Sequence, residues 1–569
     1  MSYLLDSNVI FELVRPKPAK AVLAWFENIP SEALHISVLT LGEIRQGVEL
    51  KADSARREML RLWLAHELLD FGPRILAVDI MVADRWGRLI AQVGHPVPSI
   101  DSLLAATALP HELRLVTRNQ KDFNYPGLEV INPWGSSAWD WRYLVMLLLL
   151  LSINFHLGRL LARRPSVAWL SGGIALNLLV LGYFKYADFF IGNLNAVAGT
   201  QYPLLRVILP LGISFFIFQK IAYLVDCHKG LVTDRDPLRF AIFVMFFPQL
   251  IAGPIVHHAQ IIPQLQKDRL LPDARRVSAG LFLLAVGLFK KVVIADWLGE
   301  YVNEPFAHVA ELQFLDAWTA ALAYSLQLYF DFSAYSEMAM GLALLFGIIL
   351  PVNFNSPYKA ASIAEFWRRW HITLGRFLRD YLYIPLGGNK HGQSRAVLAA
   401  LTVMVLGGLW HGAGWTFVVW GAMHGVYLAA HRVWKLSGRF TLPQPLGMAI
   451  TFLVVLFAWV MFRAASVADA ITIWKTMLGM NGVMLPSTYL AWLDGSCLKF
   501  QQSSFINGIE VWGMACLLAF AMYAKNTHEA LAIFISTAPS RRSAFYVSAM
   551  IVVYVLALGR PTTFLYFQF

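Results

Sequence analysis

The sequence predicts two parts of different fold class: an N-terminal α/β domain with a parallel sheet, then an all-α polytopic membrane domain of about ten transmembrane helices with re-entrant segments. Two observations support this. Residues 1–134 alternate short apolar strands with helical patterns, whereas long apolar segments dominate from Trp141 onward. Residues 1–132 hold 14 of the 47 basic and 16 of the 36 acidic side chains, which leaves 33 and 20 for the remainder. We therefore predict domains at residues 1–134 and 135–569.

The composition also excludes several classes of protein. With 57% hydrophobic and 15% charged residues, the chain is typical of a membrane protein. Its basic excess lies in the apolar part, where loop Lys and Arg set topology, so the net charge of +11 does not indicate nucleic-acid binding. The three cysteines show no CxxC spacing, and we expect no disulfide framework and no zinc site. The N-terminus lacks the pattern of a signal peptide.

The N-terminal part shows strand and helix patterns in alternation. Residues 3–5 (YLL) predict a short buried strand, and residues 35–50 (HISVLTLGEIRQGVEL) predict a strand followed by a helix that opens near Thr40. Residues 98–109 (PSIDSLLAATAL) start another helix, and residues 113–123 (LRLVTRNQKDF) end another strand. Strand ends and helix starts of a parallel sheet share one edge, so polar residues at these positions are expected to meet there.

Acidic residues occupy that edge. We expect one after the first strand, one in the first turn of the next helix, one near the start of a later helix and one in the loop after a later strand: Asp6, Glu43, Asp101 and Asp122. Converging carboxylates repel each other unless they hold hard cations, and oxygen ligands suit Mg²⁺ or Mn²⁺. A metal pair can activate water against a phosphodiester. Any one of these acids alone is more simply a helix cap or a solvated loop residue.

The phrases YLLDSNVI, SVLTLGEIRQGVE, IDSLLAATAL, LVTRNQKDF and VINPW together resemble the VapC-type PIN-domain ribonucleases, across nearly the whole N-terminal domain. The resemblance implies that Asp6, Glu43, Asp101 and Asp122 form the metal-binding cluster. It also implies RNA as substrate, hydrolysis as the chemistry and an antitoxin as partner. Ser7, where the family commonly has threonine, is a departure.

The remaining chain offers a series of long apolar segments, several of which reach the ~20 residues needed to cross a bilayer. They lie at about 142–158, 167–191, 205–226, 238–256, 277–297, 317–347, 396–410, 415–434, 446–463, 510–525 and 544–559.

A first polar island interrupts the apolar segments at residues 354–392. Charged residues crowd its helical stretch, among them Arg368, Arg369, Arg376, Arg379 and Asp380. An arginine at the bilayer centre costs roughly 2.5–3.5 kcal/mol, so we expect this segment to be interfacial, re-entrant or facing a cavity. On a continuous helix, Trp367, His371, Leu374 and Leu378 would share one face and direct His371 toward a protein interior.

A second island, residues 406–425 (LGGLWHGAGWTFVVWGAMHG), places His411 between paired glycines. Glycine allows the backbone to bend and to approach a ligand closely. A neutral imidazole can take a proton from a hydroxyl, which suits acyl transfer from a thioester. The alternative is a histidine satisfied by a helix carbonyl, and His424 is a candidate for that role.

The phrases FPQLIAGPIV, YFDFSAYSEMAMGLALLFG, residues 354–388 and GGLWHGAGWTFVVWGAMHG are similar to the membrane-bound O-acyltransferases, specifically the AlgI-like branch that O-acetylates alginate and similar exopolysaccharides. The resemblance covers about residues 138–569. It implies His411 as catalytic histidine, His371 as the second histidine, acetyl-CoA as donor and periplasmic polysaccharide O-acetyltransferase proteins as acceptors. Members of this branch usually begin with further hydrophobic segments before the WDWRYL-like stretch, and a PIN domain stands there in this chain.

Positive-inside reasoning in a bacterial inner (cytoplasmic) membrane places the loops near residues 159–164 and 227–239 in the cytoplasm, and hence the start of the first span outside. A ribonuclease there would meet no cytoplasmic RNA. Three interpretations stay open. The first is an acyltransferase whose PIN part is a passenger or a joined neighbouring reading frame. The second is a bifunctional protein whose PIN domain is held in the cytoplasm by a re-entrant first segment, and the third is a working PIN ribonuclease on a degenerate membrane anchor. The last is the weakest, because an anchor does not need His411 and His371.

Overall fold

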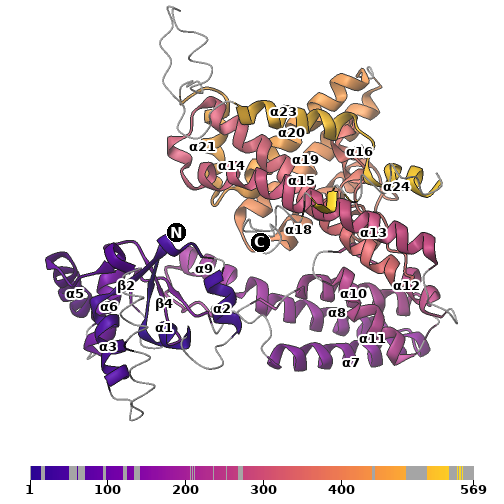
Figure 1. The fold of residues 1–569 in the computed structure, drawn as a ribbon. Helices are drawn as coiled ribbons and strands as arrows, with labels where there is room; N and C mark the ends of the chain where they lie inside the picture. The colour runs from indigo at the N-terminus through magenta and orange to yellow at the C-terminus, as the bar shows by residue number, and fades with distance from the viewer. Residues whose placement is uncertain are drawn as a thin grey trace, which may run out of the picture. The chain divides into compact units, whose positions relative to one another are not determined.

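The computed structural model describes residues 2–13, 20–27, 29–49, 61, 71–93, 98–119, 123, 125–133, 141–205, 207, 209–210, 212–232, 234, 236–250, 253–266, 273–438, 442–481, 509–536, 548, 550–552 and 554. The chain divides into two compact units, Met1–Trp141 and Arg142–Phe569, close to the predicted boundary at residue 134 (Figure 1). Each unit has its own hydrophobic clusters.

The first unit contains a parallel sheet with the strand order β3-β2-β1-β4-β5 among the described residues. Tyr3 pairs with Leu34 on one side and with Arg114 on the other, so β1 is central. The strands are β1 Tyr3–Leu5, β2 Leu34–Ser37, β3 Ile75–Leu76, β4 Arg114–Val116 and β5 Val130–Ile131. The predicted parallel α/β fold is therefore confirmed for this unit.

Helices follow the strands along the chain and cover the sheet (Figure 1). Apolar residues of the central strands, such as Leu4 and Leu5, are fully buried against them. The helices are α1 Ser7–Leu13, α2 Lys20–Glu27, α3 Val38–Glu49, α5 Ile80–Val93 and α6 Ser99–Ala108. Since α3 begins at Val38 rather than near Thr40, Glu43 lies in its second turn, and the prediction that it lies in the first is wrong.

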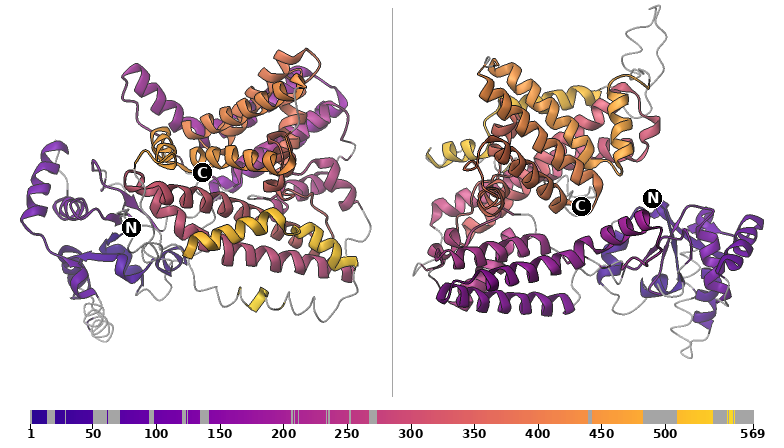
Figure 2. Two further views of the ribbon diagram at one scale, coloured as in Figure 1. Left: turned by 90° about the horizontal axis from the view of Figure 1, so that it is seen from above. Right: turned by 180° about the vertical axis from the view of Figure 1, so that it is seen from behind.

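The second unit is helical throughout the part that the structure describes (Figure 2). Its main helices are α7 Trp141–Arg163, α8 Val167–Leu181, α9 Ala187–Ala198, α10 Ile213–His228, α11 Pro237–Met245, α12 His258–Leu265, α13 Ala274–Phe289, α14 Asp296–Ala307, α15 Phe314–Leu345, α16 Ile363–Arg369, α17 Ile372–Leu378, α18 Gln393–His411, α19 Trp415–Ser437, α20 Gln444–Arg463, α21 Val467–Met477, α23 Ile509–Tyr523 and α24 Thr527–Ser536. Single π-helical turns continue three of them: η4 Gly182–Tyr186, η6 Lys290–Ala295 and η9 Arg379–Tyr383.

Five helices of the described part are long and apolar enough to cross a membrane: Tyr143–Arg163, Val167–Ala198, Ala274–Ala307, Gln393–His411 and Gln444–Arg463. Shorter apolar helices occur at Pro237–Gln249 and Glu510–Tyr523. The predicted number of about ten spans, and the re-entrant segments, stay predictions. Most of the apolar segment predicted at 544–559 lies outside the described residues.

Helix α15 lies at the centre of the largest hydrophobic cluster and is buried along most of its 32 residues. Glycines bring α13 close to it. A Cβ on Gly280 would lie 2.8 Å from the carbonyl oxygen of Gly341, and one on Gly287 would lie 2.9 Å from that of Ala334. Small residues at such contacts let helix backbones approach, which is the usual source of packing energy between helices in a membrane.

Candidate active site

His411 is the last residue of α18, and the turn Gly412–Gly414 leads from it into α19. The imidazole is half-buried and is surrounded by aromatic rings. The ring centroids of Trp410, Trp420 and Phe462 lie 5.0, 5.2 and 5.3 Å from its own. An imidazole at the end of a helix, partly accessible and fixed by rings, can meet a reacting hydroxyl.

The glycines around His411 lie at the contact between α18 and α19. A Cβ on Gly408 would lie 2.2 Å from the carbonyl oxygen of Phe417, and one on Gly412 would lie 2.1 Å from the Phe417 ring. From the facing helix α19, a Cβ on Gly421 would lie 2.3 Å from the carbonyl oxygen of Met404 in α18. The glycines therefore let α18 and α19 pack closely as a hairpin, and the approach of this backbone to a ligand stays a prediction.

The carbonyl end of α18 is held by two residues of the π-helical turn η4. Lys185 Nζ donates to the carbonyl oxygens of Trp410 and His411 at 2.6 and 2.9 Å, and the Tyr186 hydroxyl donates to that of Leu409 at 2.9 Å. The last carbonyls of a helix have no partner within it, and a cation there also interacts favourably with the helix dipole. Sequence reasoning missed both residues, although a lysine inside the apolar segment 167–191 was a visible signal.

His371 lies between α16 and α17, in the left-handed conformation with φ 42°. The prediction that Trp367, His371, Leu374 and Leu378 share one face of a continuous helix is therefore wrong, because the helix breaks at the histidine itself. A non-glycine residue with positive φ costs free energy, so the surrounding contacts must hold it there. Its side chain is fully buried, as the prediction of an interior position requires.

Asn353 supplies those contacts. Its Oδ1 accepts hydrogen bonds from His371 Nδ1 at 3.1 Å and from the Thr373 hydroxyl at 2.9 Å, and its carbonyl oxygen accepts from the Ile372 amide at 2.9 Å. Because Nδ1 carries the proton, Nε2 of His371 has the lone pair. Nε2 is buried and has no hydrogen-bond partner within the described part of the chain. The His371 ring lies 6.4 Å from that of Trp410, the neighbour of His411.

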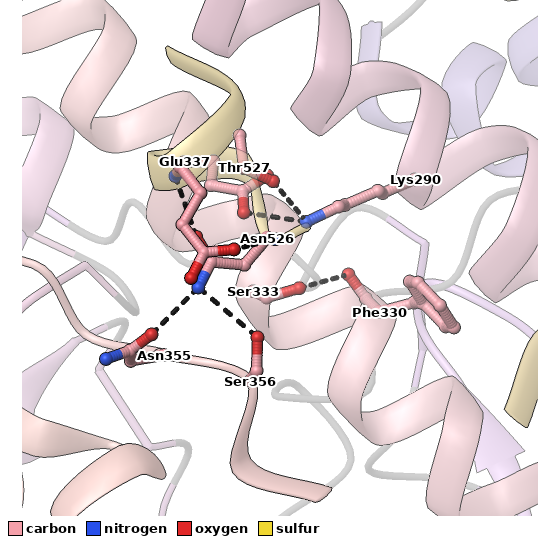
Figure 3. A network of polar contacts seen from close by, with 9 residues as sticks. Lys290, Phe330, Ser333, Glu337, Asn355, Ser356, Asn526 and Thr527 are labelled. Atoms are coloured by element: carbon pink, nitrogen blue, oxygen red, sulfur yellow. Dashed lines mark hydrogen bonds and ion pairs between the residues drawn. The ribbon is translucent and has the colours of Figure 1, made fainter. Parts of the chain in front are cut away.

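The segment that follows Asn353 is held by two hydrogen bonds from the Asn526 side chain (Figure 3). The Asn526 side chain, just before α24, donates to Asn355 Oδ1 at 2.8 Å and to the Ser356 hydroxyl at 3.2 Å. Ser356 is itself in the left-handed conformation, with φ 46°. The strained turn before His371 is thus held by a residue from near the end of the described chain.

A buried ion pair lies beside these Asn526 hydrogen bonds (Figure 3). Lys290 Nζ lies 2.7 Å from Glu337 Oε1 and donates to the Thr527 hydroxyl, also at 2.7 Å. The next residue, Lys291, lies 2.6 Å from Asp296 and 2.9 Å from Asp331. These buried charges are paired, as the cost of burying an isolated charge requires.

The arginines of the first polar island are partly paired. Arg369 lies 2.8 Å from Glu365, and Arg379 lies 2.7 Å from Asp380. Arg368 and Arg376 are exposed. That this segment is interfacial, re-entrant or facing a cavity stays a prediction.

His424 is fully buried, and its Nδ1 accepts from Trp367 Nε1 at 3.3 Å. It packs against the rings of Trp420 and Trp459, with centroids 4.8 and 6.3 Å away. Its Nε2 is buried and has no hydrogen-bond partner among the described residues, so the predicted contact with a helix carbonyl is not seen there.

In the first unit, Asp6 follows β1 and Thr117 follows the neighbouring strand β4. The buried Asp6 carboxylate accepts hydrogen bonds from the side chains of Thr117, Asn8 and Ser7. Asp101 lies in the first turn of α6, as predicted, and Asp122 lies outside the described residues.

The donor set available for a metal in this unit is incomplete. Among the described residues, no group of three His, Cys, Asp or Glu side chains could hold a metal ion. Since Asp122, the fourth predicted ligand, lies outside the described residues, the Mg²⁺ or Mn²⁺ site stays a prediction. Carboxylate oxygens are nevertheless the ligand type that Mg²⁺ takes.

The chain belongs to the membrane-bound O-acyltransferase family. The model of that family matches residues 213–469, and a model of the PIN domain matches residues 3–126. The chain is thus a multi-pass membrane protein of an acyltransferase family with an N-terminal PIN domain.

Three known proteins are similar to this chain. The peptidoglycan O-acetyltransferase of Helicobacter pylori is 44% identical over 61% of this chain and 72% of its own length. A probable alginate O-acetylase AlgI of Pseudomonas putida is 42% identical over 58% of this chain and 69% of its own. The crystal structure of FitAcB from Neisseria gonorrhoeae covers 23% of this chain and 99% of its own, with 34% identity and a TM-score of 0.23.

Proposed function

We propose that this protein transfers acetyl groups from acetyl-CoA for the O-acetylation of alginate or a similar exopolysaccharide, from within the bacterial inner membrane. The observation that carries the proposal is the half-buried His411 imidazole at the end of α18, beside the buried His371. The relatives named for O-acetylation support the substrate class. Periplasmic polysaccharide O-acetyltransferase proteins would receive the acetyl group.

In the proposed reaction, the oxygen of the acceptor hydroxyl attacks the thioester carbonyl while His411 takes the hydroxyl proton. A C–O bond forms, the C–S bond breaks, and the leaving thiolate receives the proton back. His371 presents Nε2, an unpartnered hydrogen-bond acceptor, which can orient the acceptor hydroxyl. The proposed reaction thus uses His411 as the base and His371 as the residue that orients the acceptor.

The test compares His411→Ala and His371→Ala with the unchanged chain in reconstituted vesicles. The assay measures CoA release from acetyl-CoA in the presence of the periplasmic polysaccharide O-acetyltransferase protein that would receive the acetyl group. We expect His411→Ala to lose at least about 100-fold in rate, as loss of a general base does, with the same amount of protein in the membrane. Unchanged CoA release by His411→Ala would contradict the assignment. His424→Ala is the matched control, because it removes a fully buried imidazole that has no role in the proposed transfer.

We propose a second activity for the PIN domain, metal-dependent RNA cleavage, with an antitoxin as regulator. The PIN family model and the buried, hydrogen-bonded Asp6 at the sheet edge support it. Asp6, Glu43, Asp101 and Asp122 would hold Mg²⁺ or Mn²⁺. The test incubates the purified full-length chain with RNA and Mg²⁺. The double variant Asp6→Asn, Asp101→Asn should lose cleavage, and equal cleavage by both proteins would point to a contaminating nuclease.

A further inference from the structure

The residues before the matched acyltransferase segment contact the proposed catalytic turn directly. Val167–Ala198 forms one apolar helical run, and it lies wholly before residues 213–469, which the family model matches. Three side-chain hydrogen bonds from its turn η4 end on three consecutive carbonyls, those of residues 409 to 411.

The same helical run also holds the chain on the other side of His411. Asn193 Oδ1 in α9 accepts a hydrogen bond from Trp415 Nε1 at 2.8 Å. The rings of Phe189 and Trp415 lie 5.9 Å apart. His411 and the turn Gly412–Gly414 are thus bracketed by contacts to one helix, from η4 before them and from α9 after them.

We propose that Lys185 is a positioning residue for His411: its ammonium group fixes the last turn of α18 and thereby the direction of the imidazole. This inference rests on the proposed acetyl transfer. A lysine inside an apolar span is expensive, and here its charge is directed at two carbonyl oxygens with no partner in their own helix. Charge-assisted hydrogen bonds of this kind are about twice as strong as neutral ones.

Two neighbouring residues of one π-helical turn serve the same helix end. Lys185 and Tyr186 are the last two residues of η4, and both reach the last turn of α18. Such turns inside helices occur frequently at functional sites. The region before the family-matched segment therefore contributes to the geometry of the reaction, beyond anchoring the protein.

The experiment measures kcat and KM for acetyl-CoA in the same vesicle assay. We expect Lys185→Met to lower kcat about 100-fold with KM changed less than about twofold, because a misplacement of about 1 Å costs that much in rate and leaves donor binding intact. Lys185→Arg should recover most of the loss, since guanidinium donors can still reach both carbonyls. Lys435→Met is the matched control, because this lysine is also near a helix C-terminus but is exposed.

Each outcome separates the two proposals. A Lys185→Met kcat within about twofold of the unchanged chain, or a loss that appears in KM instead, overturns the positioning role. If Lys185→Met does not give monodisperse protein, Lys185→Gln decides: the amide keeps N–H donors but loses the charge, which should lower kcat at least about fivefold, and an unchanged kcat overturns the inference. Full activity of His411→Ala would instead overturn the proposed function itself.

Discussion

Replacement of Gly421 by alanine tests whether the close packing of α18 and α19 sets the position of His411. A Cβ at residue 421 would lie 2.3 Å from the carbonyl oxygen of Met404 and 3.0 Å from Val405 Cα. The obstacle is backbone, which cannot rotate away as a flexible side chain can. The two helices must therefore separate at this point.

The structure gives the size of that separation. Ordinary van der Waals contact begins at 3.4 Å, so the 2.3 Å contact requires the backbones to part by about 1 Å. Met404 precedes His411 by seven residues, about two helical turns. A displacement of about 1 Å in the catalytic group can lower the rate about 100-fold, and overpacking of this kind costs roughly 1–3 kcal/mol of stability.

The matched control is Gly172→Ala in α8. No atom lies within 4 Å of a Cβ at that position. Both substitutions replace a helical glycine by alanine and should gain up to ~1 kcal/mol in helix propensity, so their difference reports the contact with Met404.

The assay combines CoA release in vesicles with thermal unfolding in detergent. We expect Gly421→Ala to lower both the rate and the midpoint temperature, and Gly172→Ala to change neither unfavourably. If Gly421→Ala behaved like Gly172→Ala in both measurements, the hairpin packing would not control the histidine, and the reasoning from the glycine contacts would be refuted.

Two further substitutions test buried polar contacts. Asn353→Leu keeps the approximate volume but removes the acceptor of His371 Nδ1, at a cost of ~1–3 kcal/mol for a buried donor left unsatisfied. The midpoint of thermal unfolding and the CoA release rate should fall together, and an unchanged midpoint would contradict this. Lys291→Met removes the cation between Asp296 and Asp331, which should cost about 3–5 kcal/mol and abolish monodisperse protein in size-exclusion chromatography. A normal elution profile would show that these acids tolerate its loss.

The division into two units followed from the sequence, because apolar segment length and strand-helix alternation are local properties. The positions of the strand ends were also predictable from local sequence. Asp6 and Thr117 lie 111 positions apart, yet both follow strands predicted from short apolar runs, and parallel pairing then brings strand ends together. The start of α3 was predicted near Thr40, but the helix begins at Val38, so Glu43 lies in its second turn rather than its first. Helix ends are weakly encoded in the sequence.

The sequence by itself also determined the two histidines of interest, since each stands in a polar island that lipid would not accept. Only the tertiary structure decided how they are held. His371 breaks a helix that its own periodicity favours, because buried hydrogen bonds to Asn353 offset the strain of positive φ. Lys185 and the carbonyl of Trp410 are 225 positions apart, and no local pattern relates a lysine in one apolar helix to the end of another. Such a contact exists only after the helices have packed, when the unpartnered carbonyls of α18 and the buried ammonium group satisfy each other.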